Sequence, residues 1–304
     1  MIKIGMIGMS LGNAHPYSWS AIINGIYDAG EILKAGYPGV VQYLNEHINS
    51  LGVSGASVTH VWAQDKSMAE SIACSSGIEM VVPHLEDMLG QVDAVILARD
   101  DPDYHKEMAR PFIESNIPIF IDKPLAANRS DLSYFQKSVL EGKFIFSSSS
   151  MRYAREVDLL KNSLQKLGAI ELVTAVGKKD WIKYGVHMLE AVFSLLDDPV
   201  PRSVWSVGQK DREVVHVTFS TGVVATFHLF QHISSTFQLH VFGSENYEHC
   251  YIEDSYSMFR RNIQVFLQGV REGNPRLSFE KTYNIIHTLI GALESQQSGE
   301  KVWL

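Results

Sequence analysis

The sequence predicts an α/β fold of two domains, in which a parallel sheet covered by helices precedes an α+β domain with a largely antiparallel open sheet. The chain has 304 residues, and at about 100–200 residues per domain this length indicates two domains. Continuous apolar runs alternate with helix-forming segments in the first half, as in buried parallel strands. β-Branched and aromatic residues partly alternate with polar ones in the second half, as in antiparallel strands. We predict domains at residues 1–148 and 149–304.

Apolar runs and helix-forming segments locate the elements of the first domain. We expect six strands, at Ile2–Ile7, Val58–Ala63, Met80–Val82, Val92–Ala98, Ile117–Asp122 and Lys143–Ser147. We expect the main helices at Tyr17–Ala29, Ser67–Ser75, Asp101–Ser115 and Arg129–Glu141. The segment Tyr27–Ser57 is about one helix longer than a crossover requires. We therefore interpret it as an insertion, and a lid over a site is one role for it.

In the second domain, two predicted helices precede a group of strands in the sequence and two follow it. We expect strands at Ser203–Gly208, Glu213–Ser220, Gly222–Gln231 and Thr236–Ser244. We expect helices at Ala154–Leu167, Trp181–Leu196, Ser257–Arg271 and Phe279–Gln297. The turn residues between the strands favour an antiparallel meander.

Composition and charge exclude several classes of function. The chain is 45% hydrophobic and 20% charged, with a net charge of −8, so nothing indicates the basic surface of a nucleic-acid-binding protein. Cys74 and Cys250 lack metal-ligand spacing and are expected to be reduced thiols of a cytoplasmic protein. The N-terminal segment is broken by glycines and lacks the features of a signal peptide. No apolar run reaches the length of a membrane span, so we expect a soluble protein without a membrane partner.

A glycine-containing turn follows the first predicted strand and precedes a helix, where a dinucleotide pyrophosphate binds in such folds. Gly8 occupies the first glycine position of the dinucleotide fingerprint, Ser10 occupies the second, and Gly12 comes one position early for the third. A βα turn without a ligand remains an alternative for these residues alone. The candidate cofactor residues in the turn are Gly8, Ser10, Leu11, Gly12 and Asn13.

The acid that binds the adenosine ribose in many dinucleotide sites is absent from its usual place after the second strand. That position falls on or near Ala63, and Asp65, two residues further on, is the nearest candidate. The choice between NAD and NADP therefore stays open. Lys66 is either a 2′-phosphate partner or a solvated surface lysine.

Two segments carry candidate catalytic chemistry. The buried strand that begins at Ile117 ends in Asp122, Lys123 and Pro124, which places a lysine at the sheet edge where α/β proteins bind ligands. A half-buried lysine can exchange a proton, although such a residue is more often structural.

The second segment is a predicted helix on which Lys183, His187 and Glu190 follow at i, i+4 and i+7 and so share one face. Glu190 is expected to hold the His187 ring and set its tautomer. An exposed charge cluster is the alternative for this triplet.

Taken together, these motifs resemble the Gfo/Idh/MocA family of nicotinamide-dependent sugar and polyol oxidoreductases. Asp122–Leu125 is similar to the family's E-K-P-L motif, and Gly185–Glu190 resembles its G-x-H-x-x-D helix. His105 matches the loop after the fourth strand, and Met151–Glu156 resembles the arginine-containing start of the second domain. The sequence from Ala292 to the C-terminus is similar to the family's last helix and tail.

The resemblance implies an N-terminal Rossmann dinucleotide-binding domain, NAD or NADP as cofactor, and hydride transfer to or from a sugar, sugar derivative or cyclitol. It implies Lys123 and His187 as catalytic residues, with His187 as the proton-transfer residue. The cofactor residues implied beyond the glycine turn are Asp65, Arg99, His105, Asp122, Lys123 and Pro124, and the substrate residues are Lys123, Arg152, Lys183, His187 and Glu190. We expect no metal site, and a homodimer or homotetramer formed through the open sheet.

Departures from the family pattern keep two other functions open. Lys183 stands where many members have an aspartate, and Arg99–Asp101 replaces the usual Thr-Pro. The first alternative is a glycosidase-like relative that cleaves by transient oxidation with tightly held NAD. The second is a non-catalytic ligand-binding relative that no longer holds a dinucleotide.

Overall fold

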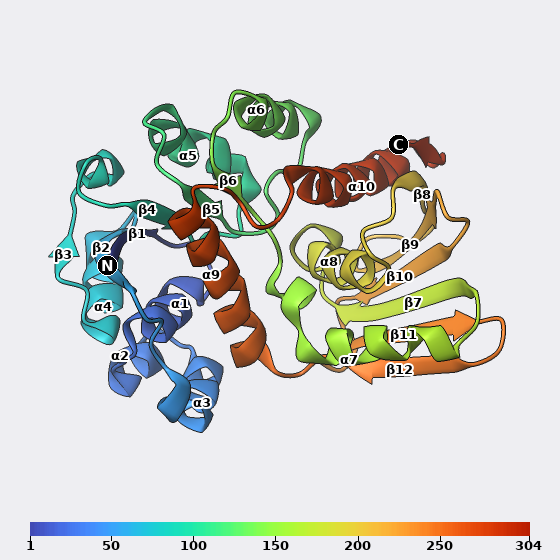
Figure 1. The fold of residues 1–304 in the computed structure, drawn as a ribbon, viewed down its shortest axis with the longest axis horizontal. Helices are drawn as coiled ribbons and strands as arrows, with labels where there is room; N and C mark the ends of the chain where they lie inside the picture. The colour runs from blue at the N-terminus through green and yellow to red at the C-terminus, as the bar shows by residue number, and fades with distance from the viewer. The chain divides into compact units, whose positions relative to one another are not determined.

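The structure is a computed structural model that describes all of residues 1–304, and the chain folds into two compact units (Figure 1). The first unit comprises Met1–Leu125, Ser133–Ser147 and Phe259–Phe279, and the second comprises Ala126–Leu132, Ser148–Met258 and Glu280–Leu304. Ser147–Ser148 is one of five places where the chain passes between the units. Phe259–Phe279, which we predicted within the second domain, is part of the first compact unit.

The first unit is built on a six-stranded parallel sheet of the Rossmann type. Its strands, in spatial order, are β3 (Met80–Val81), β2 (Ala56–Trp62), β1 (Ile2–Ile7), β4 (Ala94–Leu97), β5 (Ile119–Ile121) and β6 (Ile145–Phe146). All five neighbouring pairs are parallel. Strands β4 and β5 are fully buried, as their continuous apolar sequences predict. The order reverses direction at β1 and β4, and ligands of open α/β sheets bind at such a switch point.

Helices cover both faces of this sheet (Figure 1). They are α1 (His15–Asn24), α4 (Lys66–Ser76), α5 (His105–Glu114), α6 (Arg129–Leu140) and α9 (Ser255–Glu272). Helix α9 enters the unit through aromatic contacts: the Phe266 ring lies 5.5 Å from Phe120 and 5.8 Å from Phe146, centroid to centroid. Phe259 lies against Trp19 of α1 at 6.2 Å. These apolar contacts explain why a segment so late in the chain belongs to the first unit.

The segment 27–57 forms two short helices, α2 (Ala29–Lys34) and α3 (Pro38–Glu46), where we predicted about one helix more than a crossover needs. Asp28 caps α2 by accepting a hydrogen bond from the Glu31 backbone. Both helices contact other helices of the same unit, α2 with α4 and α3 with α1. The Tyr43 hydroxyl donates to Ser18 Oγ at 2.6 Å, which fixes α3 on α1.

The second unit contains a seven-stranded sheet with a mostly antiparallel order, as predicted. Its strands, in spatial order, are β12 (Tyr247–Tyr251), β11 (Phe237–Gly243), β7 (Ile170–Lys178), β10 (Val224–Phe230), β9 (Arg212–Phe219), β8 (Pro201–Ser206) and β13 (Val302–Trp303). Our prediction of a four-strand meander was incomplete. Strand β7 inserts between β11 and β10 and pairs with β10 in parallel.

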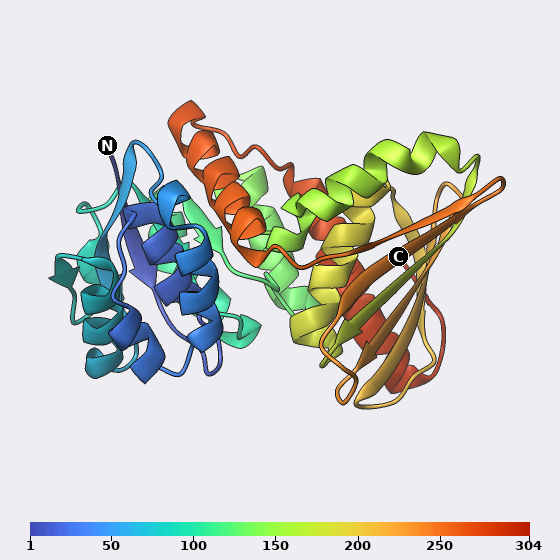
Figure 2. The same cartoon turned by 90° about the horizontal axis from the view of Figure 1, so that it is seen from below.

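Three helices lie on one side of this sheet (Figure 2): α7 (Arg155–Ser163), α8 (Val186–Leu195) and α10 (Phe279–Ser298). Alternate strand residues are buried toward the helices, and their neighbours on the other face remain partly exposed. A row of polar and aromatic side chains crosses that face on six neighbouring strands: His249, His240, Thr174, Thr226, His216 and Trp205. None of the helices in either unit is both long and apolar enough to cross a membrane.

Candidate functional site

Lys123 lies directly after β5 at the carboxyl edge of the first unit's sheet. Its side chain is only 7% exposed, and its Nζ lies 3.7 Å from Asp100 Oδ2. Asp100 follows the neighbouring strand β4, so two adjacent strand ends bring an ammonium and a carboxylate together. The peptide bond between Lys123 and Pro124 is cis. A nearly buried cation is therefore held in place by a nearly buried counter-charge.

Asp122 connects this strand end to the glycine turn and to the start of α1. Its Oδ2 accepts hydrogen bonds from Asn13 Nδ2 at 3.0 Å and from His15 Nδ1 at 2.5 Å. Its Oδ1 accepts from the Lys123 backbone N–H. Burial alone would raise the pKa of Asp122, but His15, Lys123 and these hydrogen bonds together lower it well below its ordinary value. Asp122 is thus an ionised, fully bonded carboxylate.

The glycine turn is fixed by side chains from other strand ends. Ser10 Oγ donates to Asp100 Oδ1 at 2.5 Å and accepts from the Asp100 backbone N–H at 3.0 Å. Gly12 has a φ of 79°, which favours glycine, and a Cβ added there would meet nothing within 4 Å. Leu11 is 96% exposed. The turn therefore has a fixed base and an open outer side.

Gln64 and Arg99 support the same turn. Gln64 Oε1 accepts from the Met9 backbone N–H at 3.1 Å, and Gln64 Nε2 donates to the Met9 carbonyl at 2.6 Å. Arg99 donates to Gln64 through Nη1 and to both carboxylate oxygens of Asp101. The guanidinium predicted to bind cofactor is thus engaged by protein partners, and the placement supports a bracing role for it.

Two further residues that we predicted to bind cofactor have evident structural roles. Asp65 is the N-cap of α4, and its Oδ1 accepts from the backbone N–H groups of Ser67 and Met68, as short acids do at helix starts. His105 is fully buried between the backbone carbonyls of Arg99 and Leu125. Burial lowers the pKa of His105, which favours a neutral ring that can donate to one of these carbonyls.

In the second unit, His187 lies at the start of α8, and its ring contacts Ser149. The distance from His187 Nδ1 to Ser149 Oγ is 2.5 Å, and the Tyr184 ring packs edge-on at 5.4 Å between centroids. Ser149 Oγ also accepts from the Met151 backbone N–H. The ring is therefore oriented by a hydroxyl from the segment that follows β6.

Glu190 has a different partner from the one that we predicted. Its Oε1 accepts from the Ser149 backbone N–H at 3.0 Å, and its Oε2 accepts from Arg152 Nε at 2.5 Å. Arg152 also binds Asp198 through both terminal nitrogens, and Lys281 Nζ lies 2.8 Å from Asp198. Each of the three guanidinium nitrogens of Arg152 donates to a carboxylate, and the residue is only 6% exposed, which supports a role in holding the unit together.

We predicted that Lys183, His187 and Glu190 share one face because we assumed a regular α-helix. The structure has a π-helical turn at Trp181–Gly185 immediately before α8, and this turn changes the i, i+4 relationship. Asp180 caps the turn by accepting from the Lys183 backbone N–H. The assumption of one continuous helix from residue 181 was therefore wrong.

Sequence reasoning missed four residues that the structure assigns to these clusters: His15, Gln64, Asp100 and Ser149. A signal existed for His15, which stands at the start of the helix after the glycine turn. A signal also existed for Asp100, which follows a fully buried strand. Gln64 and Ser149 act through side-chain contacts to residues distant in sequence, and no local pattern marks them.

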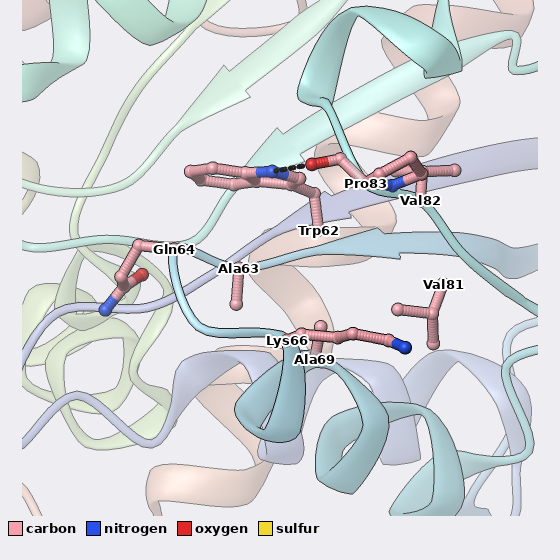
Figure 3. A pocket seen from close by; sticks show the side chains of 8 residues that line it. All are labelled: Trp62, Ala63, Gln64, Lys66, Ala69, Val81, Val82 and Pro83. Carbon is pink, nitrogen blue, oxygen red and sulfur yellow. Dashed lines mark hydrogen bonds between the residues drawn. The ribbon is translucent and has the colours of Figure 1, made fainter.

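Three observations indicate that the first unit can hold a dinucleotide. The turn after β1 is open around Gly12, α1 begins just beyond it, and a cavity of about 500 Å³ lies at the ends of β2 and β3 (Figure 3). Backbone N–H groups at a helix start suit a pyrophosphate. The structure has no group of three or more His, Cys, Asp or Glu side chains placed to hold a metal ion.

Comparison with known sequences agrees with this arrangement. Residues 33–147 match the Gfo/Idh/MocA family, described as an oxidoreductase family with an NAD-binding Rossmann fold. Inositol 2-dehydrogenase 1 of Saccharopolyspora erythraea is 33% identical over 115 residues. That alignment spans 35% of this chain and 33% of the relative's length.

Solved structures share the fold over the whole chain. Myo-inositol 2-dehydrogenase from Lactobacillus plantarum superposes with a TM-score of 0.79 at 15% identity, covering 100% of this chain and 99% of the other. Myo-inositol dehydrogenase from Lactobacillus casei, in complex with NAD(H) and myo-inositol, has a TM-score of 0.77 at 19% identity, covering 100% and 96%. GenD2 of gentamicin A biosynthesis, in complex with NAD, has a TM-score of 0.78 at 16% identity, covering 100% and 96%. Residues 33–147 thus match the Gfo/Idh/MocA family in sequence, and the chain as a whole shares the fold of these solved structures.

Proposed function

We propose that this protein is an NAD(P)-dependent oxidoreductase that transfers a hydride to or from a hydroxyl or carbonyl carbon of a sugar, sugar derivative or cyclitol. One observation carries the proposal: a nearly buried Lys123 ammonium is held by Asp100 at the carboxyl edge of a Rossmann sheet, beside a braced glycine turn. An ammonium in this position can donate a hydrogen bond to a substrate oxygen. An ion pair that only stabilised the strand ends would not need the open glycine turn that lies beside Lys123 and Asp100.

The proposed roles of the chain's residues follow from their contacts. The nicotinamide ring of the bound cofactor supplies the hydride acceptor or donor. Lys123 stabilises the negative charge that develops on the substrate oxygen, because Asp100 holds its ammonium in place. His187 exchanges the hydroxyl proton, with its Nδ1 bound to Ser149. A positioned acid or base of this kind contributes about 10²–10⁴-fold to the rate.

The substrate class rests on the names of similar proteins together with the polar site. The relative and two of the structural neighbours are inositol dehydrogenases, and one of these contains myo-inositol. A polyol substrate presents several hydroxyls, which suit an ammonium donor and an imidazole. We therefore propose a carbohydrate-like small molecule, without choosing one sugar or a direction of reaction.

The test is a Lys123→Met variant assayed against a panel of sugars and cyclitols with both cofactors. Turnover on any substrate accepted by the wild type should fall by about 10²-fold or more, because the charge at the substrate oxygen is lost. Lys137→Met is a matched control, since Lys137 is 78% exposed and pairs only with Glu141 at 3.9 Å. Undiminished turnover in Lys123→Met would contradict the catalytic assignment.

The two alternative functions correspond to different outcomes of the same measurements. Glycoside cleavage without net NADH formation, with cofactor that copurifies, indicates the transient-oxidation mechanism. Absence of binding of both NADH and NADPH in a fluorescence titration indicates a ligand-binding relative. Binding of one cofactor, with net reduction or oxidation of a polyol, supports the dehydrogenase.

A further inference from the structure

A cavity of about 500 Å³ lies in the first unit, where β2 and β3 end and α4 begins (Figure 3). It is lined by Trp62, Ala63, Gln64, Lys66, Ala69, Val81, Val82 and Pro83. The Trp62 indole N–H donates to the Pro83 carbonyl at 3.3 Å, which fixes the aromatic wall. The cavity therefore has a formed shape within a single unit.

The walls of this cavity contain no carboxylate. Ala63 is the first residue after β2, where an acid binds the adenosine ribose hydroxyls in NAD sites. Asp65, two residues after Ala63, does not line the cavity. Its carboxylate is occupied by the Ser67 and Met68 backbone N–H groups and by Ser67 Oγ. A 2′-hydroxyl would therefore find no acid to accept its hydrogen bond, and a 2′-phosphate would meet no carboxylate in the wall.

Lys66 is the only charged residue among those that line the cavity. Its Nζ pairs with Glu70 at 3.4 Å, and the two side chains are 83% and 55% exposed. An exposed pair of this kind is weak, so the ammonium can exchange Glu70 for a dianionic phosphate. Lysine binds phosphate as a point charge, without a fixed donor geometry.

We propose that this cavity takes the 2′-phosphate side of NADP(H), with Lys66 as the counter-charge, and that the protein prefers NADP(H) to NAD(H). The inference rests on the proposed function, in which the glycine turn binds a nicotinamide dinucleotide. It adds the identity of the cofactor and the residues that select it. Ala63 leaves room and charge-neutral surroundings for the phosphate, and Lys66 binds it.

The experiment compares binding of NADPH with NADH, and of 2′,5′-ADP with ADP, to the full-length protein by calorimetry. Wild type should bind each 2′-phosphorylated ligand at least about 10-fold more tightly than its partner. Lys66→Ala should lose about 10-fold in affinity for NADPH and change NADH binding less than about twofold. Glu70→Gln is the matched control, because it removes only the competing carboxylate and should leave or improve NADPH binding.

Ala63→Asp restores an acid at the end of β2 and should reverse the preference toward NADH. Equal or tighter binding of NADH by the wild type, or an unchanged NADPH affinity in Lys66→Ala, would overturn the inference while leaving the proposed function intact. Failure of the wild type to bind any of the four ligands would overturn the proposed function itself. If Ala63→Asp does not fold, the comparison of 2′,5′-ADP with ADP on wild type still decides the question.

Discussion

Ser149 Oγ lies 2.5 Å from His187 Nδ1, and the backbone N–H of the same serine donates to Glu190. The histidine is thereby tied through a serine to the buried ion pair of Glu190 and Arg152. Ser149 therefore contacts both the ring nitrogen of His187 and the carboxylate of this ion pair.

Replacing Ser149 by alanine should release the His187 ring. We expect Ser149→Ala to lower kcat by about 10-fold, corresponding to about 1.4 kcal/mol, and to change KM by less than about threefold. Ser149→Thr keeps the hydroxyl and should retain most of the activity. The imidazole ¹⁵N shifts of His187 report its tautomer and should move in the alanine variant alone. Identical kcat and ring shifts in Ser149→Ala and wild type would refute this positioning role.

Loss of the Ser10 hydroxyl should loosen the glycine turn. Ser10→Ala removes two hydrogen bonds to Asp100 and leaves a buried carboxylate with fewer partners, which costs about 1–3 kcal/mol in the free energy of unfolding. Cofactor affinity should fall as well, because the turn must then be ordered on binding. Urea denaturation and cofactor titration measure the two effects. Unchanged stability would show that the Asp100 contact is not formed in solution.

Asp198 should make the stability of the second unit dependent on acid pH. Burial raises the pKa of Asp198, but Arg152 and Lys281 outweigh it and lower the pKa below its ordinary value. The stabilisation is therefore present above the unfolded-state pKa of about 3.9 and is lost as the pH falls through the lower folded-state pKa. Asp198→Asn should cost about 2 kcal/mol at pH 7, and the difference from wild type should shrink below about pH 4. A difference that is constant with pH would argue against the ion pair.

Helix α9 should contribute strongly to the stability of the first unit. Phe266 is fully buried against Phe120, Phe144 and Phe146, so Phe266→Ala should lower the free energy of unfolding by about 3–5 kcal/mol. Tyr247, which is 66% exposed, provides a control, and Tyr247→Ala should change it by less than about 0.5 kcal/mol. Chemical denaturation measures both. Equal effects would mean that α9 does not pack as described.

The helix-free face of the second unit's sheet is our candidate for self-association, and we propose a homodimer or homotetramer formed through it. Thr174 and Thr226 are neighbours in the row that crosses this face, with their hydroxyls 3.2 Å apart. Thr226→Arg places a charge there and should shift the protein toward a monomer in light scattering, with little change in its secondary structure. A monomeric wild type, or an unaffected oligomer, would contradict the proposal.

Local sequence patterns predicted the first unit better than the second. The apolar runs that contain β4 and β5 are buried throughout the strands, as continuous apolar sequence predicts, and β1 is buried from Ile4 onward. Strand β7 was missed, although its buried residues alternate with more exposed ones. The place of Phe259–Phe279 depends on contacts with rings more than 100 positions earlier, which no local window contains.

Strand topology made it predictable which residues of the candidate site lie together at the edge of the sheet. The strand ends of a parallel sheet share one edge. Hydrogen bonds join Ser10 to Asp100 and join Asp122 to Asn13 and to the Lys123 backbone, and the ion pair of Lys123 with Asp100 connects the two sets. For two acidic residues, the contacts in the structure differ from the ones that we predicted. Glu190 pairs with Arg152, and Asp65 caps a helix.

The braced glycine turn has a kinetic consequence. Gln64 holds both backbone groups of Met9, Ser10 is bonded to Asp100, and Asn13 is bonded to Asp122. A loop fixed in this way has already lost its conformational freedom when the chain folds, so a dinucleotide would dock on a preformed surface. Its association rate should then follow diffusion and charge steering, and differences between cofactors should be found mainly in how quickly each one leaves.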